Sequence, residues 1–245
     1  MKMCVYGPCQ KLLVIRSMSP PLSRRDHCAR GMALLRFPLS LRMVEDMLAA
    51  RGIIVSHQTI RSWAVKFGRH FAREIRRRSA GCLGDKWHLD ECAVAINGKT
   101  QWLWRAVDQD GFVLEVPVQS RRNAKAATRL MRKLLKAQGQ TPRVMITDTL
   151  RSYDAARRDL MPGVEHRSHK GLNNRAENSH QPTRRRERTM KRFKSARQLQ
   201  RFVSIHDPIA NLFHFPRNTL SSAQHRDLRN AAMQIWNKIT CVAAA

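Results

Sequence analysis

Residues 86–118 read KWHLDECAVAINGKTQWLWRAVDQDGFVLEVPV, and this stretch decides the fold. Two dipeptides, Asn97-Gly98 and Asp110-Gly111, divide it into three runs that are rich in apolar, aromatic and β-branched residues. Asn-Gly and Asp-Gly pairs readily adopt the positive φ that tight hairpin turns need. The stretch therefore predicts a three-stranded antiparallel meander, with strands over residues 86–96, 100–107 and 112–118.

Helices and strands alternate after this meander. A helix with one apolar face comes first, formed by Ala127, Leu130, Met131 and Leu134. We then expect a strand at 144–146, a helix at 153–160, a strand at 164–166 and a helix from about 173. This order, βββ-α-β-α-β-α, predicts an α/β protein of the ribonuclease H-like fold, in which the first strand lies mid-sheet, beside the fourth and parallel to it. Ligands of such sheets bind at the carboxyl ends of the strands.

Two amphipathic helices are expected upstream of the meander. The first begins behind an N-cap at Ser40 and ends near Gly52, and the second begins at Ser56. Each repeats apolar residues at helical spacing: Leu41, Val44, Met47 and Leu48, then Ile60, Trp63, Ala64 and Phe67. Two short helices around a glycine-containing turn outline a small helix-turn-helix domain, although an ordinary helical hairpin has the same local pattern.

The polar face of the second helix carries side chains that can hydrogen-bond base edges or phosphates in a major groove. These candidate DNA-binding residues are His57, Gln58, Arg61 and Ser62. The basic stretch that follows, residues 69–78, favours the DNA-binding interpretation over the plain hairpin.

The charge balance points to a polyanionic partner. The 245 residues include 46 Lys and Arg against 18 Asp and Glu, which gives a net charge of +28 spread along the chain. Nucleic acid is the first candidate. The six cysteines form no CxxC pair, so free thiols in a reducing cytoplasm are expected. No apolar run approaches the ~20 residues that span a bilayer, which predicts a cytoplasmic protein without membrane contact.

Three acidic residues are candidate metal ligands and catalytic groups. Asp90 lies within the first predicted strand, Asp148 ends the fourth, and Glu177 lies near the start of the helix after it. Carboxylates that converge repel one another and raise each other's pKa unless cations neutralise them. Such a cluster implies two Mg²⁺ or Mn²⁺ ions, which activate a nucleophile and stabilise the leaving oxygen during displacement at phosphorus.

Each carboxylate has an alternative interpretation. Glu91 is a possible metal ligand in place of Asp90, and Asp148 stands at an ordinary strand exit. The pattern Asn174-x-x-Glu177 resembles a capping box, in which the glutamate only bonds its own helix terminus. In that case the third carboxylate has to be sought elsewhere, and the nearest candidates are Glu187 and Glu165.

Several motifs occur together and in order between about Phe37 and about Trp236. They are Pro38-Leu39-Ser40, Val44-Glu45-Asp46-Met47-Leu48, Arg51-Gly52, Trp87-His88-Leu89-Asp90-Glu91, Trp104-Arg105-Ala106-Val107-Asp108, Thr147-Asp148, Glu165-His166-Arg167, Asn173-Asn174-Arg175-Ala176-Glu177-Asn178 and Phe193-Lys194-Ser195. In these motifs the chain resembles the IS-six family of bacterial insertion-sequence transposases. The resemblance implies that Asp90, Asp148 and Glu177 are the family's DDE triad.

The resemblance also implies a basic residue seven positions after the glutamate, which is Arg184 here. Two helical turns would place it on the face of Glu177, where it can hold a DNA phosphate, although Pro182 lies between them. The run Arg184-Arg185-Arg186 is therefore a candidate DNA contact, or else a solvated basic surface. The chain departs from the family in Thr149, where a lysine is usual, and in a shorter spacing between Asp148 and Glu177.

The activity that the resemblance implies is metal-dependent DNA cleavage and strand transfer at terminal inverted repeats, with replicative transposition through cointegrates. The expected partners are double-stranded element ends and target DNA, and joining two ends requires at least a dimer. The expected location is the bacterial cytoplasm, associated with the nucleoid. Two alternatives remain: a catalytically defective remnant that only binds specific DNA, and a related nuclease that cleaves without joining.

The chain is expected to divide into five parts. Residues 1–34 form an irregular leader, and 35–68 form the helix-turn-helix domain. A basic linker covers 69–86, the DDE catalytic domain covers 87–190, and a helical basic region covers 191–245.

Overall fold

The computed structural model describes residues 33–79, 83–215 and 220–242. The predicted leader lies outside these residues, except for its last two positions, which begin the short helix α2 (Ala33–Arg36). Within the described ranges, none of the helices combines the length and apolar character that a membrane span requires.

A six-stranded mixed sheet forms the centre of the molecule, in the order β3-β2-β1-β5-β6, with β4 also paired to β2. Strands β1 (Lys86–Ile96) and β2 (Lys99–Asp108) are antiparallel, and the turn between them has positive φ at Asn97 and Gly98. Strands β5 (Val144–Thr147) and β6 (Glu165–Ser168) run parallel to β1. The first strand therefore lies mid-sheet beside and parallel to the strand after the meander, which confirms the predicted topology.

The third predicted strand is broken in two. Of the predicted stretch 112–118 and the residue after it, β3 (Val113–Glu115) and β4 (Val118–Gln119) pair with β2, and Val116 and Pro117 lie between them. Proline has no N–H to donate to a sheet ladder, so a continuous strand cannot pass through this position. The carbonyl of Pro117 still accepts a hydrogen bond from the amide of Trp104, at 3.0 Å.

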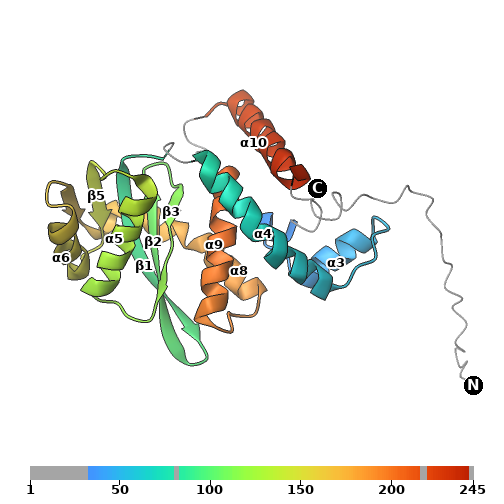
Figure 1. The fold of residues 1–245 in the computed structure, drawn as a ribbon, viewed down its shortest axis with the longest axis horizontal. Helices are drawn as coiled ribbons and strands as arrows, with labels where there is room; N and C mark the ends of the chain where they lie inside the picture. Colours follow the sequence, from blue (N-terminus) through green and yellow to red (C-terminus); the bar gives the residue numbers. More distant parts are fainter. Residues whose placement is uncertain (1–32, 80–82, 216–219, 243–245) are drawn as a thin grey trace, which may run out of the picture.

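Helices cover both faces of the sheet (Figure 1). Helices α5 (Ala124–Gln138) and α6 (Arg151–Leu160) pack on the face that carries Trp87 and Leu89. The other face carries α7 (Asn174–Ser179), α8 (Gln181–Thr189) and α9 (Ala196–Leu212). Because side chains alternate along a strand, β1 offers its even-numbered residues to the α7 side and its odd-numbered residues to the α5 and α6 side.

The two predicted upstream helices are present. Helix α3 (Leu41–Ala49) begins behind Ser40, whose hydroxyl accepts from the amide of Met43, and the chain turns at Gly52 with φ 75°. Helix α4 (His57–Ser79) follows, with Ser56 accepting from the amide of Thr59. The apolar faces of the two helices meet in a small core that contains Val44, Leu48, Ile53 and Ile60.

Residues 69–79, the described first part of the predicted basic linker, are helical and continue α4 to Ser79. Gly68, a residue that often ends helices, lies inside α4 where the helix approaches α9 closely. A Cβ at this position would lie 2.8 Å from a methyl group of Ile205. Glycine is present here because it allows close packing. Figure 1 shows α4 passing α9, with α10 (Ser222–Val242) beside it, and Phe71 contacts Trp236 edge-on at 5.4 Å.

Candidate active site

Two predicted aspartates lie side by side at the sheet. Leu89 of β1 is in register with Thr147, the last residue of the adjacent parallel strand β5, so the next residues along the chain are Asp90 on β1 and Asp148 just after β5. Asp90 is 9% exposed, and Asp148 lies just beyond the carboxyl end of β5, where its Oδ1 accepts from the amide of Leu150 at 3.0 Å. This is the edge at which parallel sheets bind ligands.

Glu91 belongs to the same cluster. Asp90, Glu91 and Asp148 each offer one carboxylate oxygen, and these oxygens lie within 4.8 Å of one another. The sequence left open whether Asp90 or Glu91 is the relevant acid. In the structure both residues take part in the cluster, although they leave β1 toward opposite faces of the sheet.

The Glu91 carboxylate is held on both of its oxygens. Its Oε2 accepts from the Tyr153 hydroxyl and its Oε1 from Arg122 Nε, both at 2.6 Å, and the Glu91 side chain is 1% exposed. Burial raises the pKa of Glu91, while the hydrogen bonds from Tyr153 and Arg122 act in the opposite direction. Burial also raises the pKa of Tyr153, and the nearby Glu91 charge adds to that effect, so Tyr153 remains a proton donor.

Arg122 links two members of the cluster. Besides its bond to Glu91, it places Nη2 3.5 Å from Asp148 Oδ2, and its guanidinium lies over the Trp102 ring at 5.2 Å. The Arg122 side chain is 39% exposed and that of Asp148 is 22% exposed, so solvent reaches the cluster at Asp148. The cation offsets part of the repulsion among the three carboxylates.

His180 contacts Asp90 from the other face. Its Nε2 lies 3.1 Å from Asp90 Oδ2. Burial lowers the pKa of His180, although the hydrogen bond to Asp90 opposes this effect. A neutral imidazole can donate its Nε2 proton to Asp90 and fix the orientation of that carboxylate.

Glu177 is exposed on α7 and is not among the three clustered acids. Helix α7 is fixed against β1 at both of its ends. Before the helix, the side-chain amide of Asn173 donates to the carbonyl of Leu89 at 2.8 Å, and after it His180 contacts Asp90. Residues four before and three after Glu177 lie near it on the helix surface. Glu177 therefore borders the side of α7 that faces β1 and Asp90.

The capping-box alternative does not fit the start of α7. The helix begins at Asn174 behind Asn173, and Asn173 makes no side-chain bond to the helix. Glu177 is thus the fourth helical residue, whereas a capping-box glutamate is the third.

Pro182 separates Glu177 from the arginine run. Helix α7 ends at Ser179 and α8 starts at Gln181, so Glu177 and Arg184 lie on different helices. Arg184 and Arg185 are exposed, and Arg184 Nη2 lies 3.4 Å from the carbonyl of Ala93. Both side chains therefore lie at the protein surface.

Arg186 has to be removed from the predicted DNA contacts. It is 3% exposed and donates to the backbone carbonyls of Leu34 and Leu39. Burial lowers its pKa to about 10. Helical spacing turns Arg186 inward together with Thr183, so it connects α8 to the upstream helices.

The second upstream helix presents most of its predicted DNA-binding residues to solvent. Gln58, Arg61 and Ser62 are exposed at the start of α4. His57 is half-buried, and its Nδ1 lies 3.4 Å from Glu45 Oε2 on α3. The three exposed side chains are free to meet a ligand, while His57 also joins the two helices.

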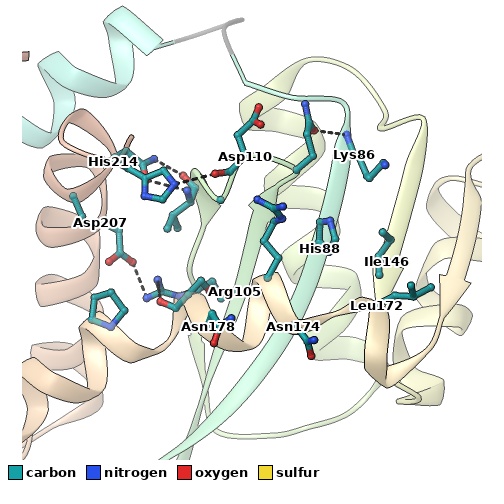
Figure 2. A pocket seen from close by; sticks show the side chains of 18 of the residues that line it. Lys86, His88, Arg105, Asp110, Ile146, Leu172, Asn174, Asn178, Asp207 and His214 are labelled. Carbon is teal, nitrogen blue, oxygen red and sulfur yellow. Dashed lines mark hydrogen bonds and ion pairs between the residues drawn. The ribbon is translucent and has the colours of Figure 1, made fainter. Parts of the chain in front are cut away.

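A polar network behind α7 holds that helix in place, and Figure 2 shows it from the side of a pocket of about 730 Å³. Arg105, opposite Asp90 in the β1–β2 register and 1% exposed, donates to the Ser179 carbonyl, the Thr183 hydroxyl and Asp207. Burial would raise the pKa of Asp207, but Arg105 and His206 bring it below its ordinary value. None of the three clustered acids lines this pocket.

A known family of DNA-processing domains matches more than half of the chain. The family model of the DDE domain of IS240-type transposases matches residues 84–215, a range that includes Asp90, Asp148 and Glu177. The chain belongs to this family. The resemblance to the IS-six family, predicted from the motifs, is thereby confirmed.

Staphylococcus aureus proteins are among the relatives. The transposase for insertion sequence element IS257 in transposon Tn4003 is 29% identical over 151 residues, which are 60% of this chain and 66% of the relative. The transposase for the element IS431mec matches with the same identity and coverage. The aligned part thus spans slightly less than two thirds of these relatives.

Solved structures that match part of this chain include the catalytic domain of Mos1 mariner transposase. It has a TM-score of 0.39 and 14% identity, and the match covers 74% of this chain and 93% of that one. The HTLV-2 integrase catalytic core domain in complex with magnesium has a TM-score of 0.33 and 16% identity, with 64% and 85% covered.

Three residues of the site were not predicted from the sequence: Arg122, Tyr153 and His180. They contact Glu91 or Asp90 across 31, 62 and 90 positions of the chain. Local periodicity carries no signal at such distances. For Tyr153 the only hint was an aromatic residue in the first turn of the helix after Asp148.

Proposed function

We propose that this protein is a DNA transposase that cuts element ends and joins them to target DNA. The observation that carries the proposal is the juxtaposition of Asp90 on β1 with Asp148 just beyond the end of the adjacent parallel strand β5, in a chain that belongs to a DDE transposase family. The staphylococcal relatives are named transposases, and the excess of basic residues suits a DNA substrate.

The donor set of the cluster fits divalent metal. Its oxygens are carboxylate oxygens, the ligands that Mg²⁺ and Mn²⁺ prefer, and they are close enough to share an ion. Bound metal would lower the pKa of a water or 3′-hydroxyl nucleophile and stabilise the leaving oxygen. We assign two ions to the site, held by Asp90, Asp148 and Glu177.

Glu177 is better suited than Glu91 to be the third metal ligand, and Glu91 is better suited to holding its neighbours in position. Both Glu91 oxygens already accept short hydrogen bonds in a buried setting, so Glu91 would lose these partners if it turned toward a metal. Glu177 is exposed on the helix that Asn173 and His180 fix beside Asp90. Its carboxylate has no comparable bonds to give up among the described residues.

Other residues of the chain are proposed to hold these carboxylates in position and to contact DNA. His180 orients Asp90, and the pair of Tyr153 and Arg122 orients Glu91 next to Asp148. Arg184 and Arg185 are exposed near the end of α7 and suit phosphate contacts beside the site.

Helices α3 and α4 are proposed to form the helix-turn-helix domain, with Gln58, Arg61 and Ser62 reading the terminal inverted repeats. Their exposure at the start of α4 supports this assignment. The active form is proposed to be at least a dimer, since two element ends have to be joined, and the outcome to be a cointegrate. The catalytic part corresponds to residues 87–190, followed by the helical basic region.

An in vitro strand-transfer assay tests the proposal. It uses the full chain, pre-cut ends of its own element, target DNA and Mg²⁺. Joining is expected for the unaltered protein, and Glu177→Gln should reduce joining by several orders of magnitude while leaving the melting temperature and DNA binding nearly unchanged.

The outcomes separate the alternatives. Nicking without joining would identify a nuclease, and binding without nicking would identify a defective remnant. Near-normal joining by Glu177→Gln would move the third ligand to another acid.

A further inference from the structure

A groove lined by arginines lies between α4 and α9. It measures about 410 Å³, and both of its walls are helical. Two of the arginines come from α4 and two from α9; they are Arg69, Arg76, Arg197 and Arg201. The other lining residues are neutral: Ala72, Gln200, Ser204 and Ile205. Four positive charges therefore meet in one concave surface that no carboxylate lines.

The two helical walls of the groove are packed closely against each other. Gly68 lets α4 approach Ile205 of α9 closely, and Phe71, Ile75 and Ile209 continue the same core below the groove. Arg76 Nη2 donates to the carbonyl of Ser204 at 2.9 Å and so ties the two walls together. The arginines extend from a fixed framework, which lowers the entropy lost when they bind a ligand.

The groove has unused hydrogen-bonding capacity. Among the described residues, Arg69 and Arg197 make no side-chain hydrogen bond or ion pair, and the Nε of Arg201 is buried without a partner. The acid nearest along α4, Glu74, pairs with Arg77 at 2.8 Å and does not line the groove. The positive charge of the groove is thus left for an external anion.

We propose that this arginine groove binds the phosphodiester backbone of duplex DNA, independently of base sequence; the proposal builds on the DNA substrate of the proposed function. Guanidinium groups match phosphate oxygens in a bidentate fork. Arg61 and Arg69 are eight residues apart on α4, about 12 Å along the helix axis. One duplex can therefore contact the start of α4 with its base edges and the groove with its backbone.

Base contacts and backbone contacts would then be made by separate parts of the protein. Residues at the start of α4 would select the sequence, and the groove would fix the duplex against α9, which packs on the catalytic sheet through Leu199 and Val203. Phosphate contacts position a duplex and carry no sequence information.

The test is the salt dependence of DNA binding by the full chain. Fluorescence anisotropy with a mixed-sequence duplex is measured between about 50 and 300 mM NaCl for the unaltered protein and for Arg69→Ala/Arg197→Ala. Each phosphate contact contributes about 0.9 to the slope of log K against log salt. The double variant should lower that slope by about 1.8 and weaken binding about tenfold or more at low salt.

The matched control is Arg129→Ala/Arg132→Ala, which removes two exposed arginines from α5 on the opposite face of the sheet. Its slope should stay near that of the unaltered protein. Arg69→Lys/Arg197→Lys keeps the charge and should restore most of the slope. Far-UV circular dichroism and thermal melts of all variants exclude misfolding.

Equal slopes for the groove variant and the α5 control, with both folded, would overturn the groove as a DNA site. The joining assay of Glu177→Gln reports on the proposed function separately. A chain that shows the groove effect but never joins DNA would refute the transposase activity and leave the groove intact.

Discussion

Asp90 and Glu91 are neighbours in sequence but occupy very different surroundings. Glu91 lies on the α6 side of β1, buried, with both carboxylate oxygens bonded to Tyr153 and Arg122. Asp90 lies on the α7 side, where His180 bonds one oxygen and Glu177 stands exposed on the helix beside it. Clustering alone therefore does not assign a role to a carboxylate. A carboxylate whose two oxygens both accept hydrogen bonds is suited to holding neighbouring groups in position. A carboxylate with a free oxygen is suited to binding metal.

The α7 side of β1 depends on Arg105, and removing it should give the largest change in stability. Arg105→Ala leaves the Asp207 carboxylate buried without its cation, which typically costs about 3–5 kcal/mol. Urea unfolding should show this loss, while Arg129→Ala on the exposed face of α5 should stay within about 0.5 kcal/mol. Equal stability of the two variants would mean that Arg105 does not hold α7 in place.

His88 should make the same side of the sheet sensitive to pH. Burial, with Arg175 and Lys86 nearby, lowers the pKa of His88 to about 4. The unfolded chain binds a proton near pH 6.5 and the folded chain does not, so stability should fall as pH drops from about 6.5 to 4, by up to about 3 kcal/mol. The measurement is urea unfolding across this range; His88→Gln should flatten this component, and an unchanged profile would contradict the assignment.

Stability should depend less on the hydrogen bonds of Glu91 than on Arg105 or His88. Tyr153→Phe removes one hydrogen bond to a buried carboxylate and leaves one of its oxygens unsatisfied, at a cost of about 1–2 kcal/mol. Thermal melts should show this loss, with joining still detectable because Tyr153 touches Glu91 and not Asp90. Complete loss of joining by a well-folded Tyr153→Phe would give the Glu91 side a direct part in the chemistry.

The smallest effect is expected on metal affinity, through the contact between Arg122 and Asp148. Its guanidinium lies 3.5 Å from Asp148 and partly exposed, where such an interaction is worth about 1 kcal/mol or less. A metal ion at Asp148 has to displace this interaction, so Arg122 competes with the ion. Arg122→Gln should therefore tighten Mn²⁺ binding by up to about fivefold in isothermal titration calorimetry, and Arg129→Gln should leave it unchanged. Weaker binding would show that Arg122 supports the metal site instead of competing with it.

The sheet could be predicted from the sequence because its signals are local. Asn97-Gly98 fixes the first hairpin, and Asp90 and Asp148 follow from the strand positions. Pro117 could have predicted the break in the third strand, but the apolar run around it masked that signal. Residues 69–79, predicted as part of a basic linker, continue α4, and the role of Gly68 within this helix is explained only by its close approach to Ile205 of α9.

The supporting residues of the site could not be predicted in this way. Tyr153 and His180 reach the cluster only once α6 and α7 have packed on opposite faces of the sheet. The burial of Arg186 likewise depends on the upstream helices, whose carbonyls it binds. Side-chain chemistry identified the acids, and tertiary packing determines what each acid is free to do.

Strand transfer by Asp90→Asn, measured beside Glu91→Gln with thermal melts of both, tests the central claim most directly. Asp90→Asn should lower joining by several orders of magnitude and leave the melting temperature nearly unchanged, since it removes a charge needed at the metals. Glu91→Gln should melt earlier but retain joining within about a hundredfold, the usual cost of losing a supporting residue around a metal site. The reverse result, with Glu91→Gln inactive and Asp90→Asn joining normally, would contradict the account.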